Sequence, residues 1–302
     1  MKTYIEVEGQ DTGRPSERPP KTNWRIEMVK KGLSLLQYAS PKKSAEIIWH
    51  YFTMPGKVRF TDGQLDIMAH AEVSQSSYKG DTIKSYRWGK KGPKVLLCHG
   101  WRSKTADFRK MIQAFLDEGY VVEGLDLRAH GQSEGSHTAL PEYRDILKNH
   151  VAKNGPYEVV VGYSIGGLAS GLVLSEMGPA FQPKHLYLLA SPPYVRYFFK
   201  DIIEEIGCNE AVYESMCNLV NEHYKQPVDY FDLRMKANAL KNIKTHLIYC
   251  EDDETVPFQK GLELEECWPH TSFVHTKGLG HYKIMVNPAI IEYILNGVKQ
   301  PT

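Results

Sequence analysis

One serine lies between a predicted strand and a predicted helix. The apolar run at 157–161 is typical of a buried strand, and apolar residues at 168–173 recur at helical spacing. Between them lies Gly162-Tyr163-Ser164-Ile165-Gly166. The glycines leave room for the strand and the helix to approach each other closely. The pattern therefore predicts an α/β domain with Ser164 at a helix N-terminus, where N–H groups and the helix dipole stabilise negative charge.

Strands and helices alternate along the chain from Pro93 onward. This alternation predicts a mostly parallel, doubly wound sheet with helices on both faces. The clearest strand candidates are compact apolar runs, at residues 94–98, 120–125, 185–189, 246–250 and 271–275. Residues 64–87 alternate in polarity, which predicts antiparallel edge strands in front of the parallel part.

A serine hydroxyl is a weak nucleophile unless a base removes its proton and a third group orients that base. His281 follows the strand at 271–275, and four acidic residues, 251–254, leave the end of the strand at 246–250. Serine, acid and histidine thus occur in the order expected for a triad built on such a turn. The acidic residues and His281 both follow the carboxyl ends of predicted strands, which is the edge where open α/β sheets place their sites.

Two more motifs follow predicted strands. His99-Gly100-Trp101 comes after the strand at 94–98, and Asp126-Leu127-Arg128-Ala129-His130-Gly131-Gln132-Ser133 comes after the strand at 120–125. Together with the turn at 162–166 and the acid and histidine segments, they resemble the α/β-hydrolase superfamily over residues of about 84 to 297. The run at 126–133 is similar to the lysophospholipase-like and serine-aminopeptidase-like branch. Two positions depart from that pattern, since Ala129 and Cys250 stand where the family often has glycine.

The resemblance implies which carboxylate completes the triad. The family has an Asp-x-x-Val-Pro pattern, and only Asp253 has Val256 and Pro257 at the matching offset. We therefore expect Ser164, Asp253 and His281 to be the catalytic residues. Asp252 is the alternative, expected instead to cap the loop or face solvent, and Glu251 and Glu254 are expected to be solvated turn charges.

The resemblance also implies an oxyanion hole made by two main-chain N–H groups, those of Trp101 and Ile165. The indole of Trp101 is expected to wall the acyl pocket. His99 is interpreted as a structural histidine, because His281 already fills the role of the base. In the family, Asp126 and His130 brace the loop beside the nucleophile.

Roughly 55 residues separate the strand at 185–189 from the strand at 246, more than one crossover helix needs. We expect the excess to form a small helical lid insertion at about 192–240. Its beginning is rich in aromatic residues, and Tyr194, Tyr197 and Phe198 are candidate substrate-binding residues. The alternative is that these rings only pack the lid onto the domain.

The predicted domain organisation is an N-terminal arm and helical preface at 1–60, followed by an α/β-hydrolase domain at 61–302. Residues 8–23 have three prolines and no apolar periodicity, which is typical of a loosely docked arm. Ser40-Pro41 then predicts the start of a helix, as N-cap and first helical residue, which Pro55-Gly56 ends.

Composition narrows the classes of partner. The 37 basic and 36 acidic residues nearly cancel, and no basic stripe indicates binding to nucleic acid. No apolar stretch reaches the ~18 residues needed to span a bilayer, and the N-terminus does not read as a secretory signal. We expect a cytoplasmic protein. Its five cysteines form no Cys-x-x-Cys pair, so no metal site is predicted.

These features predict a serine hydrolase, carboxylesterase-like, acting on a small-molecule ester through an acyl-enzyme and needing no cofactor. Ester is preferred to amide because an aromatic lid suits an apolar acyl group. An amidase or peptidase, a thioesterase and a carbon–carbon bond hydrolase use the same groups and stay open as alternatives, as does a ligand-binding protein without turnover. The sequence makes no prediction of acyl-chain length or oligomeric state.

Overall fold

The protein is described from a computed structural model that covers residues 2–6 and 24–299. The arm predicted at 8–23 lies outside the described residues. The described residues divide into two compact units. Unit 1 contains residues 2–6, 55–193 and 233–299, and unit 2 contains residues 24–54 and 194–232.

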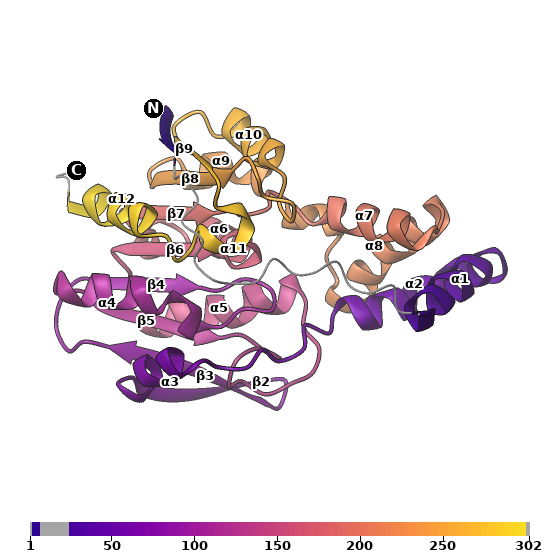
Figure 1. The fold of residues 1–302 in the computed structure, drawn as a ribbon, viewed down its shortest axis with the longest axis horizontal. Coiled ribbons are helices and arrows are strands. Elements are labelled where there is room, and N and C mark those ends of the chain that lie inside the picture. Colours follow the sequence, from indigo (N-terminus) through magenta and orange to yellow (C-terminus); the bar gives the residue numbers. More distant parts are fainter. Residues whose placement is uncertain (1, 7–23, 300–302) are drawn as a thin grey trace. The chain divides into compact units, whose positions relative to one another are not determined.

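Unit 1 is built on one nine-stranded sheet with the strand order β1-β9-β8-β7-β6-β4-β5-β3-β2 (Figure 1). Every neighbouring pair from β1 to β5 is parallel, and β3 and β2 pair antiparallel at one edge. This confirms the predicted mostly parallel sheet. The strands are β1 (Lys2–Glu6), β2 (Glu72–Tyr78), β3 (Asp81–Trp88), β4 (Lys94–Cys98), β5 (Val121–Asp126), β6 (Val159–Tyr163), β7 (His185–Leu189), β8 (Lys244–Cys250) and β9 (Ser272–Lys277).

Helices cover both faces of this sheet. One face packs against α4 (Arg109–Asp117) and α12 (Pro288–Lys299) in a continuous apolar core. The alternate strand residues, such as Leu96 and Val160, are equally buried, on the side of α5 (Leu140–Asn154) and α6 (Ile165–Met177). The central strands are apolar on both sides because both sides are covered. Shorter elements of unit 1 are α3 (Asp62–Ala69), η1 (Thr105–Phe108), η2 (Pro179–Phe181), η4 (Leu233–Lys236), α9 (Ala237–Leu240), α10 (Phe258–Cys267) and α11 (Gly280–Lys283).

The prediction of strands from residue 64 onward was wrong for its first part. Residues 62–69 form α3, and the antiparallel hairpin occupies only 72–88. The helix begins after Thr61, whose backbone N–H donates to Gln64 Oε1 at 2.9 Å. A threonine followed three residues later by glutamine is a helix-start signal, and it outweighs the weak alternation of polarity.

Unit 2 is helical. It consists of α1 (Trp24–Ala39), α2 (Pro41–Phe52), α7 (Arg196–Ile206), α8 (Glu210–Tyr224) and η3 (Val228–Phe231). The predicted start of α2 is confirmed, because Ser40 Oγ accepts a hydrogen bond from the N–H of Lys43 at 3.2 Å. Trp49 of α2 stacks on His223 of α8 at a ring distance of 5.8 Å and meets Phe199 of α7 edge-on at 6.1 Å.

The segment 194–232 leaves and re-enters unit 1 at a single point. The N–H of Leu233 donates to the carbonyl oxygen of Pro193 at 2.8 Å. The indole of Trp268 in turn donates to the carbonyl oxygen of Leu233 at 3.0 Å. The two ends of the helical insertion are therefore joined within unit 1 itself.

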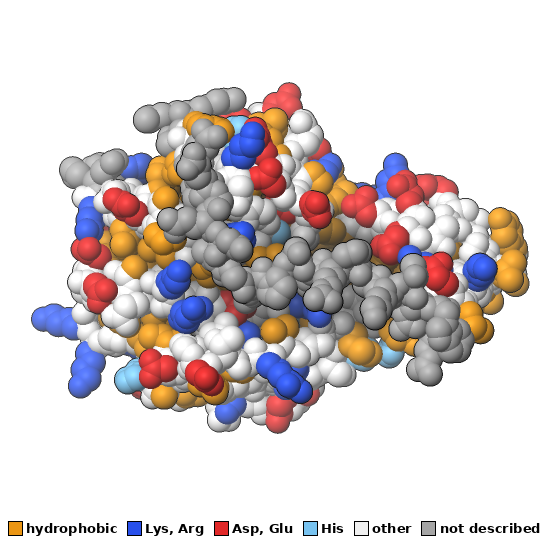
Figure 2. Space-filling model, viewed as in Figure 1, with side chains coloured by type: hydrophobic (Ala, Val, Ile, Leu, Met, Phe, Trp, Pro, Cys, Tyr) orange, Lys and Arg blue, Asp and Glu red, His pale blue; other side chains and the backbone are white. Residues whose placement is uncertain are grey.

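Charged side chains of both signs are interspersed on the face drawn in Figure 2. The described side chains on that face form no extended area of a single sign. Among residues 2–6 and 24–299, no helix combines the length and the apolar composition that crossing a membrane requires.

Candidate active site

Ser164 occupies a sharp turn between the last residue of β6 and the first residue of α6. Its backbone has φ 52° and ψ −131°, in a region that residues other than glycine rarely adopt. Two main-chain bonds hold it there. Its N–H donates to the carbonyl oxygen of Leu189 on β7 at 2.9 Å, and its own carbonyl accepts from the N–H of Gly167 at 2.9 Å. The turn thus presents the hydroxyl at the carboxyl end of the central strands.

The glycines of this turn are required by close packing. A Cβ on Gly162 would lie 2.4 Å from the Cα of Gly167. A Cβ on Gly166 would lie 2.3 Å from the carbonyl oxygen of His99. Both distances are below any real Cβ contact, so strand, turn and helix approach this closely only because these side chains are absent.

Three side chains from three different elements meet at this turn. His281 Nε2 lies 3.1 Å from Ser164 Oγ, and His281 Nδ1 lies 2.7 Å from Asp253 Oδ2. All three residues are at least nine-tenths buried. The second oxygen, Asp253 Oδ1, accepts from the N–H groups of Thr255 and Val256, both at 2.8 Å. With the carboxylate held in this way, Nδ1 carries a proton and Nε2 is free to accept the proton of the serine hydroxyl.

The neighbouring acidic residues point elsewhere. Asp252 Oδ2 accepts a hydrogen bond from the N–H of Gly278. Glu251 pairs with His275 at 2.8 Å, and Glu254 is exposed. Of residues 251–254, Asp253 therefore has the contact with the imidazole that the sequence pattern predicted.

The loop after β4 is fixed by two buried histidines. The N–H of Leu127 donates to His99 Nε2 at 3.0 Å, so the proton of His99 lies on Nδ1, which donates to the carbonyl oxygen of Gly100 at 2.8 Å. The N–H of Arg102 donates to His130 Nε2 at 3.1 Å. His99 therefore binds backbone, as interpreted from the sequence, and Trp101 lies between two anchored residues.

Both histidines are held in the neutral form. Burial lowers the pKa of His99 to about 4 and the pKa of His130 to about 3. Since each Nε2 accepts a backbone N–H, protonation would remove the acceptor and release the loop. At neutral pH the anchoring of residues 100–102 is complete.

Asp126 braces the same region from β5. It is fully buried, and burial raises the pKa of its carboxyl group. Its oxygens accept from the N–H of Thr105 at 2.9 Å, the N–H of Gln132 at 2.8 Å and the hydroxyl of Tyr86 at 2.9 Å. The carboxylate of Asp126 thus links η1, which follows the loop after β4, to the loop after β5 and to β3.

Two tyrosines near the loop and the triad were not singled out from the sequence. The Tyr163 ring lies 5.1 Å from the imidazole of His281. Tyr143 of α5 stacks on Trp101 at 6.2 Å, and its hydroxyl lies 2.9 Å from His130 Nε2. Tyr163 is visible in the motif itself as the residue before the serine. No sequence signal marks Tyr143, because its contact depends on how α5 crosses the sheet.

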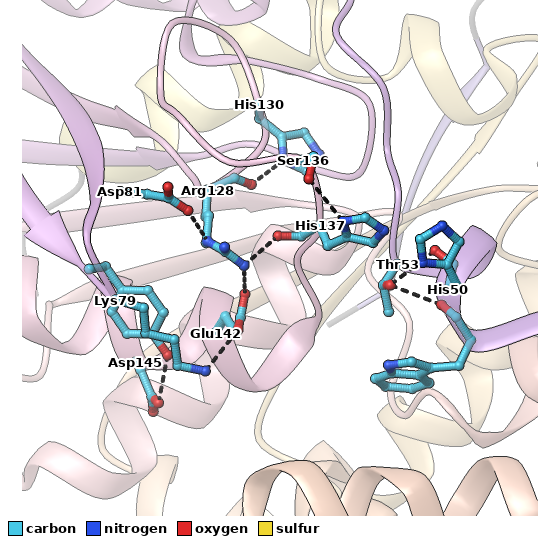
Figure 3. A network of polar contacts seen from close by, with 12 residues as sticks. His50, Thr53, Lys79, Asp81, Arg128, His130, Ser136, His137, Glu142 and Asp145 are labelled. Carbon is cyan, nitrogen blue, oxygen red and sulfur yellow. Dashed lines mark hydrogen bonds and ion pairs between the residues drawn. The ribbon is translucent and has the colours of Figure 1, made fainter. Parts of the chain in front are cut away.

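Arg128 belongs to the motif at 126–133 and anchors the loop that follows β5 (Figure 3). Its guanidinium pairs with Asp81 at 2.6 Å and with the buried carboxylate of Glu142 at 3.1 Å, and it donates to the carbonyl oxygen of His137 at 2.7 Å. Lys79 pairs with Glu142 from the other side at 2.9 Å. The network joins the β2–β3 hairpin, the loop between β5 and α5, and α5 itself. It does not include Ser164, Asp253 or His281.

The candidate substrate-binding aromatic residues belong to unit 2. Tyr197 is buried, with its ring 4.0 Å from that of Phe198 and 5.6 Å from that of Tyr194. Tyr194 and Phe198 are half-buried. The rings therefore form one aromatic cluster at the start of α7, and their role toward substrate stays a prediction. Within the described residues, no group of three histidine, cysteine, aspartate or glutamate side chains is placed to hold a metal ion.

The sequence pattern described as "Alpha/beta hydrolase family" matches residues 95–290, which include Trp101 and the whole Ser164–His281–Asp253 arrangement. The chain belongs to the α/β-hydrolase family. Its sheet order and helix placement are those of the α/β-hydrolase fold predicted from the motifs. The narrower lysophospholipase-like or serine-aminopeptidase-like branch stays a prediction.

Relatives of this α/β hydrolase include further hydrolases. It is 25% identical over 251 residues to the "Uncharacterized hydrolase YugF" of Bacillus subtilis (strain 168), covering 69% of this chain and 91% of that protein. A shorter stretch of 78 residues is 32% identical to the pimeloyl-(acyl-carrier protein) methyl ester esterase of Stenotrophomonas maltophilia (strain R551-3), covering 26% and 29% of the two chains. Among solved structures, an esterase from Pyrococcus furiosus matches with a TM-score of 0.60 and 20% identity, covering 82% of this chain and 96% of that chain. The protein is thus a hydrolase of this family with esterase-like neighbours.

Proposed function

We propose that this α/β hydrolase is a serine hydrolase that cleaves a carboxylic ester with a small or medium acyl group. The observation that carries the proposal is the line of hydrogen bonds from Asp253 through His281 to Ser164, with distances of 2.7 and 3.1 Å. A buried carboxylate, an imidazole in a fixed tautomer and a serine at a strained turn together form an activated nucleophile.

The reaction follows from this arrangement. Ser164 Oγ attacks the acyl carbon while its proton passes to His281 Nε2, and the Nδ1–H bond to Asp253 stabilises the imidazolium. The tetrahedral intermediate expels the alcohol, which takes the proton from Nε2 and leaves an acyl-enzyme. A water molecule then gives a proton to Nε2 and attacks the acyl carbon. The second intermediate releases the carboxylic acid and returns the proton to Ser164 Oγ. No cofactor takes part in this sequence.

The developing oxyanion is assigned to the N–H groups of Trp101 and Ile165. Ile165 is the first residue of α6, where backbone N–H groups have no partner within the helix. Trp101 follows Gly100, whose carbonyl is held by His99, and precedes Arg102, whose N–H is held by His130. A preorganised donor of this kind contributes about 3 kcal/mol to lowering the barrier.

Ester is the substrate class that the relatives favour. They include a methyl ester esterase and an esterase. Tyr194, Tyr197 and Phe198 are the proposed contacts for an apolar acyl group. Substitution of each ring by alanine is expected to raise the KM for long acyl chains more than for acetate esters.

The test is labelling with a fluorophosphonate probe beside hydrolysis of short-chain nitrophenyl esters. We expect the wild type to be labelled and active, and Ser164→Ala to lose both properties. Ser175→Ala is the matched control, because its hydroxyl lies on the same helix and only donates to the carbonyl oxygen of Leu172. A wild type that is unlabelled and inactive would instead support a ligand-binding protein. Faster turnover of amides, thioesters or carbon–carbon substrates than of esters would reject the ester assignment.

A further inference from the structure

The strand β2 ends the sheet on the side opposite β1 (Figure 1). All residues from Glu72 to Ser77 are exposed, and Tyr78 is half-buried. Within the part of the chain that the structure describes, β2 has one strand neighbour, β3. Its outer row of backbone N–H and C=O groups is therefore open to pairing.

The turn between β2 and β3 determines which backbone groups of β2 point outward. Lys79 and Gly80 form a two-residue turn, with φ of 51° and 88°. In such a hairpin the flanking residues, Tyr78 and Asp81, exchange hydrogen bonds. In an antiparallel pair, residues that bond across and residues that point away alternate along each strand.

The far side of β3 confirms this alternation. The N–H of Thr82 donates to Glu134 Oε2 at 2.8 Å, and the N–H of Lys84 donates to Ser133 Oγ at 2.8 Å. Both groups point away from β2. The residues opposite Thr82 and Lys84 on β2 therefore turn their own backbone groups outward.

Those outward residues are Val73, Gln75 and Ser77. Between residues 73 and 78 the strand lacks the charged residues, prolines and bulges that usually protect an edge from pairing with another strand. No lysine, arginine, aspartate, glutamate or proline occurs between residues 73 and 78. The one-to-one register with β3 is unbroken over the whole strand, so no bulge twists the edge away.

We propose that β2 is a self-association surface and pairs antiparallel with β2 of a second copy of this chain. Two-fold symmetry and the outward positions define the register. Gln75 lies opposite Gln75 of the second copy, and Val73 lies opposite Ser77. Each of these three pairs exchanges two backbone hydrogen bonds, and the two sheets become one.

Charge at the ends of the strand favours a second copy over an unrelated peptide. The strand begins with Glu72 and is followed by Lys79, which pairs with Glu142 at 2.9 Å and is still about half-exposed. Antiparallel pairing brings the acidic start of one strand to the basic end of the other, at both ends of the interface. A closed two-fold pairing also uses up the edge, so assembly stops at a dimer.

Cysteine crosslinking tests the register. In a Cys267→Ser background, which removes the exposed native thiol, Gln75→Cys is expected to form a disulfide-linked dimer under mild oxidation. Its two Cα atoms would be ~5.5 Å apart, which a disulfide spans. Ser77→Cys alone is the control, since the Cα atoms of its two copies would be separated by about 15 Å. A mixture of Val73→Cys and Ser77→Cys chains is expected to crosslink.

Sedimentation equilibrium tests the association itself. The wild type is expected to be in monomer–dimer equilibrium, and Gln75→Pro is expected to weaken the dimer roughly tenfold or more by removing a central N–H from each strand. Gln75→Thr keeps that N–H and should associate as the wild type does. By the alternation along β2, the N–H of Gln75 points away from β3. The Gln75→Pro monomer should therefore keep its circular dichroism and its rate of ester hydrolysis per subunit.

The proposal would be overturned by a wild type that stays monomeric at all concentrations, by a dimer that Gln75→Pro leaves unchanged, or by crosslinking of Ser77→Cys as fast as Gln75→Cys. Assemblies larger than a dimer would also overturn it, because they require a second surface. None of these results bears on the proposed chemistry at Ser164.

Discussion

Exchange of Asp253 for asparagine tests the proposed triad most sharply, because it replaces one carboxylate oxygen by an NH₂ group and removes the negative charge at almost constant volume. Asp253 Oδ1 accepts from two backbone N–H groups at 2.8 Å, so the amide oxygen of an asparagine would take that position. The amide NH₂ would then face His281 Nδ1, which the carboxylate now contacts at 2.7 Å. To accept that donor, the imidazole must move its proton to Nε2. It can then no longer take the proton of Ser164.

The size of the effect has two parts. At ~4 Å and an effective dielectric constant of about 20, the carboxylate stabilises the imidazolium by about 4 kcal/mol, which is about 10³ in rate. The unfavourable tautomer adds to this loss. We expect Asp253→Asn to lower kcat for a nitrophenyl ester by about 10⁴, with KM within a factor of about three.

Asp252→Asn is the matched control. Its side chain accepts from the N–H of Gly278, and an amide oxygen can do the same. Steady-state kinetics of both variants at pH 7.5, with unfolding curves to confirm that each is folded, give the comparison. Equal losses in the two variants, or a larger loss at Asp252, would refute the assignment of Asp253.

Three further predictions concern stability, each measured by urea unfolding. Burial lowers the pKa of His99 from 6.5 to about 4, so the unfolded state binds a proton that the folded state does not. His99 alone should therefore lower the free energy of unfolding by up to about 3 kcal/mol from pH 7 to 4, and His130, whose pKa burial also lowers, should add to this fall. A flat profile would contradict the neutral form of both histidines. Gly166→Ala places a Cβ 2.3 Å from the carbonyl oxygen of His99 and should lower the free energy of unfolding by about 1–3 kcal/mol and reduce activity. Gly32→Ala is the control, because a Cβ there would meet no atom within 4 Å, and it should raise the free energy of unfolding by up to about 1 kcal/mol. Arg128→Lys should lower stability by about 1–2 kcal/mol at unchanged KM, because a single ammonium cannot replace the separate guanidinium nitrogens that contact Asp81 and Glu142. An unchanged midpoint would rule out a structural role.

The central part of the fold was predictable because short-range rules govern it. Buried parallel strands read as apolar runs, so β4, β6 and β7 were found within two residues of their observed bounds. The turn at Ser164 carries its own glycine pattern. The choice of Asp253 came from the resemblance of residues 253–257 to the family's Asp-x-x-Val-Pro pattern, and the same residue contacts His281 in the structure.

Other features depend on contacts between distant segments. Nothing within residues 2–6 indicates that this strand pairs with β9, some 270 residues later. The helices at 24–52 were expected as a preface to the sheet, but they group with α7 and α8 in unit 2. The anchoring of Arg102 by His130 needs the loop geometry as well as the sequence. The start of α3 is different, since Thr61 and Gln64 gave a readable signal that the alternation of polarity obscured.

The hydrogen bond between Leu233 and Pro193 has a consequence for how this scaffold can change. Residues 194–232 depart and return at one main-chain contact, so the strands that lead to Ser164, Asp253 and His281 are continuous without this segment. Its sequence and length can therefore change with little constraint from the sheet, and the constraint on them comes from the helices α1 and α2 instead.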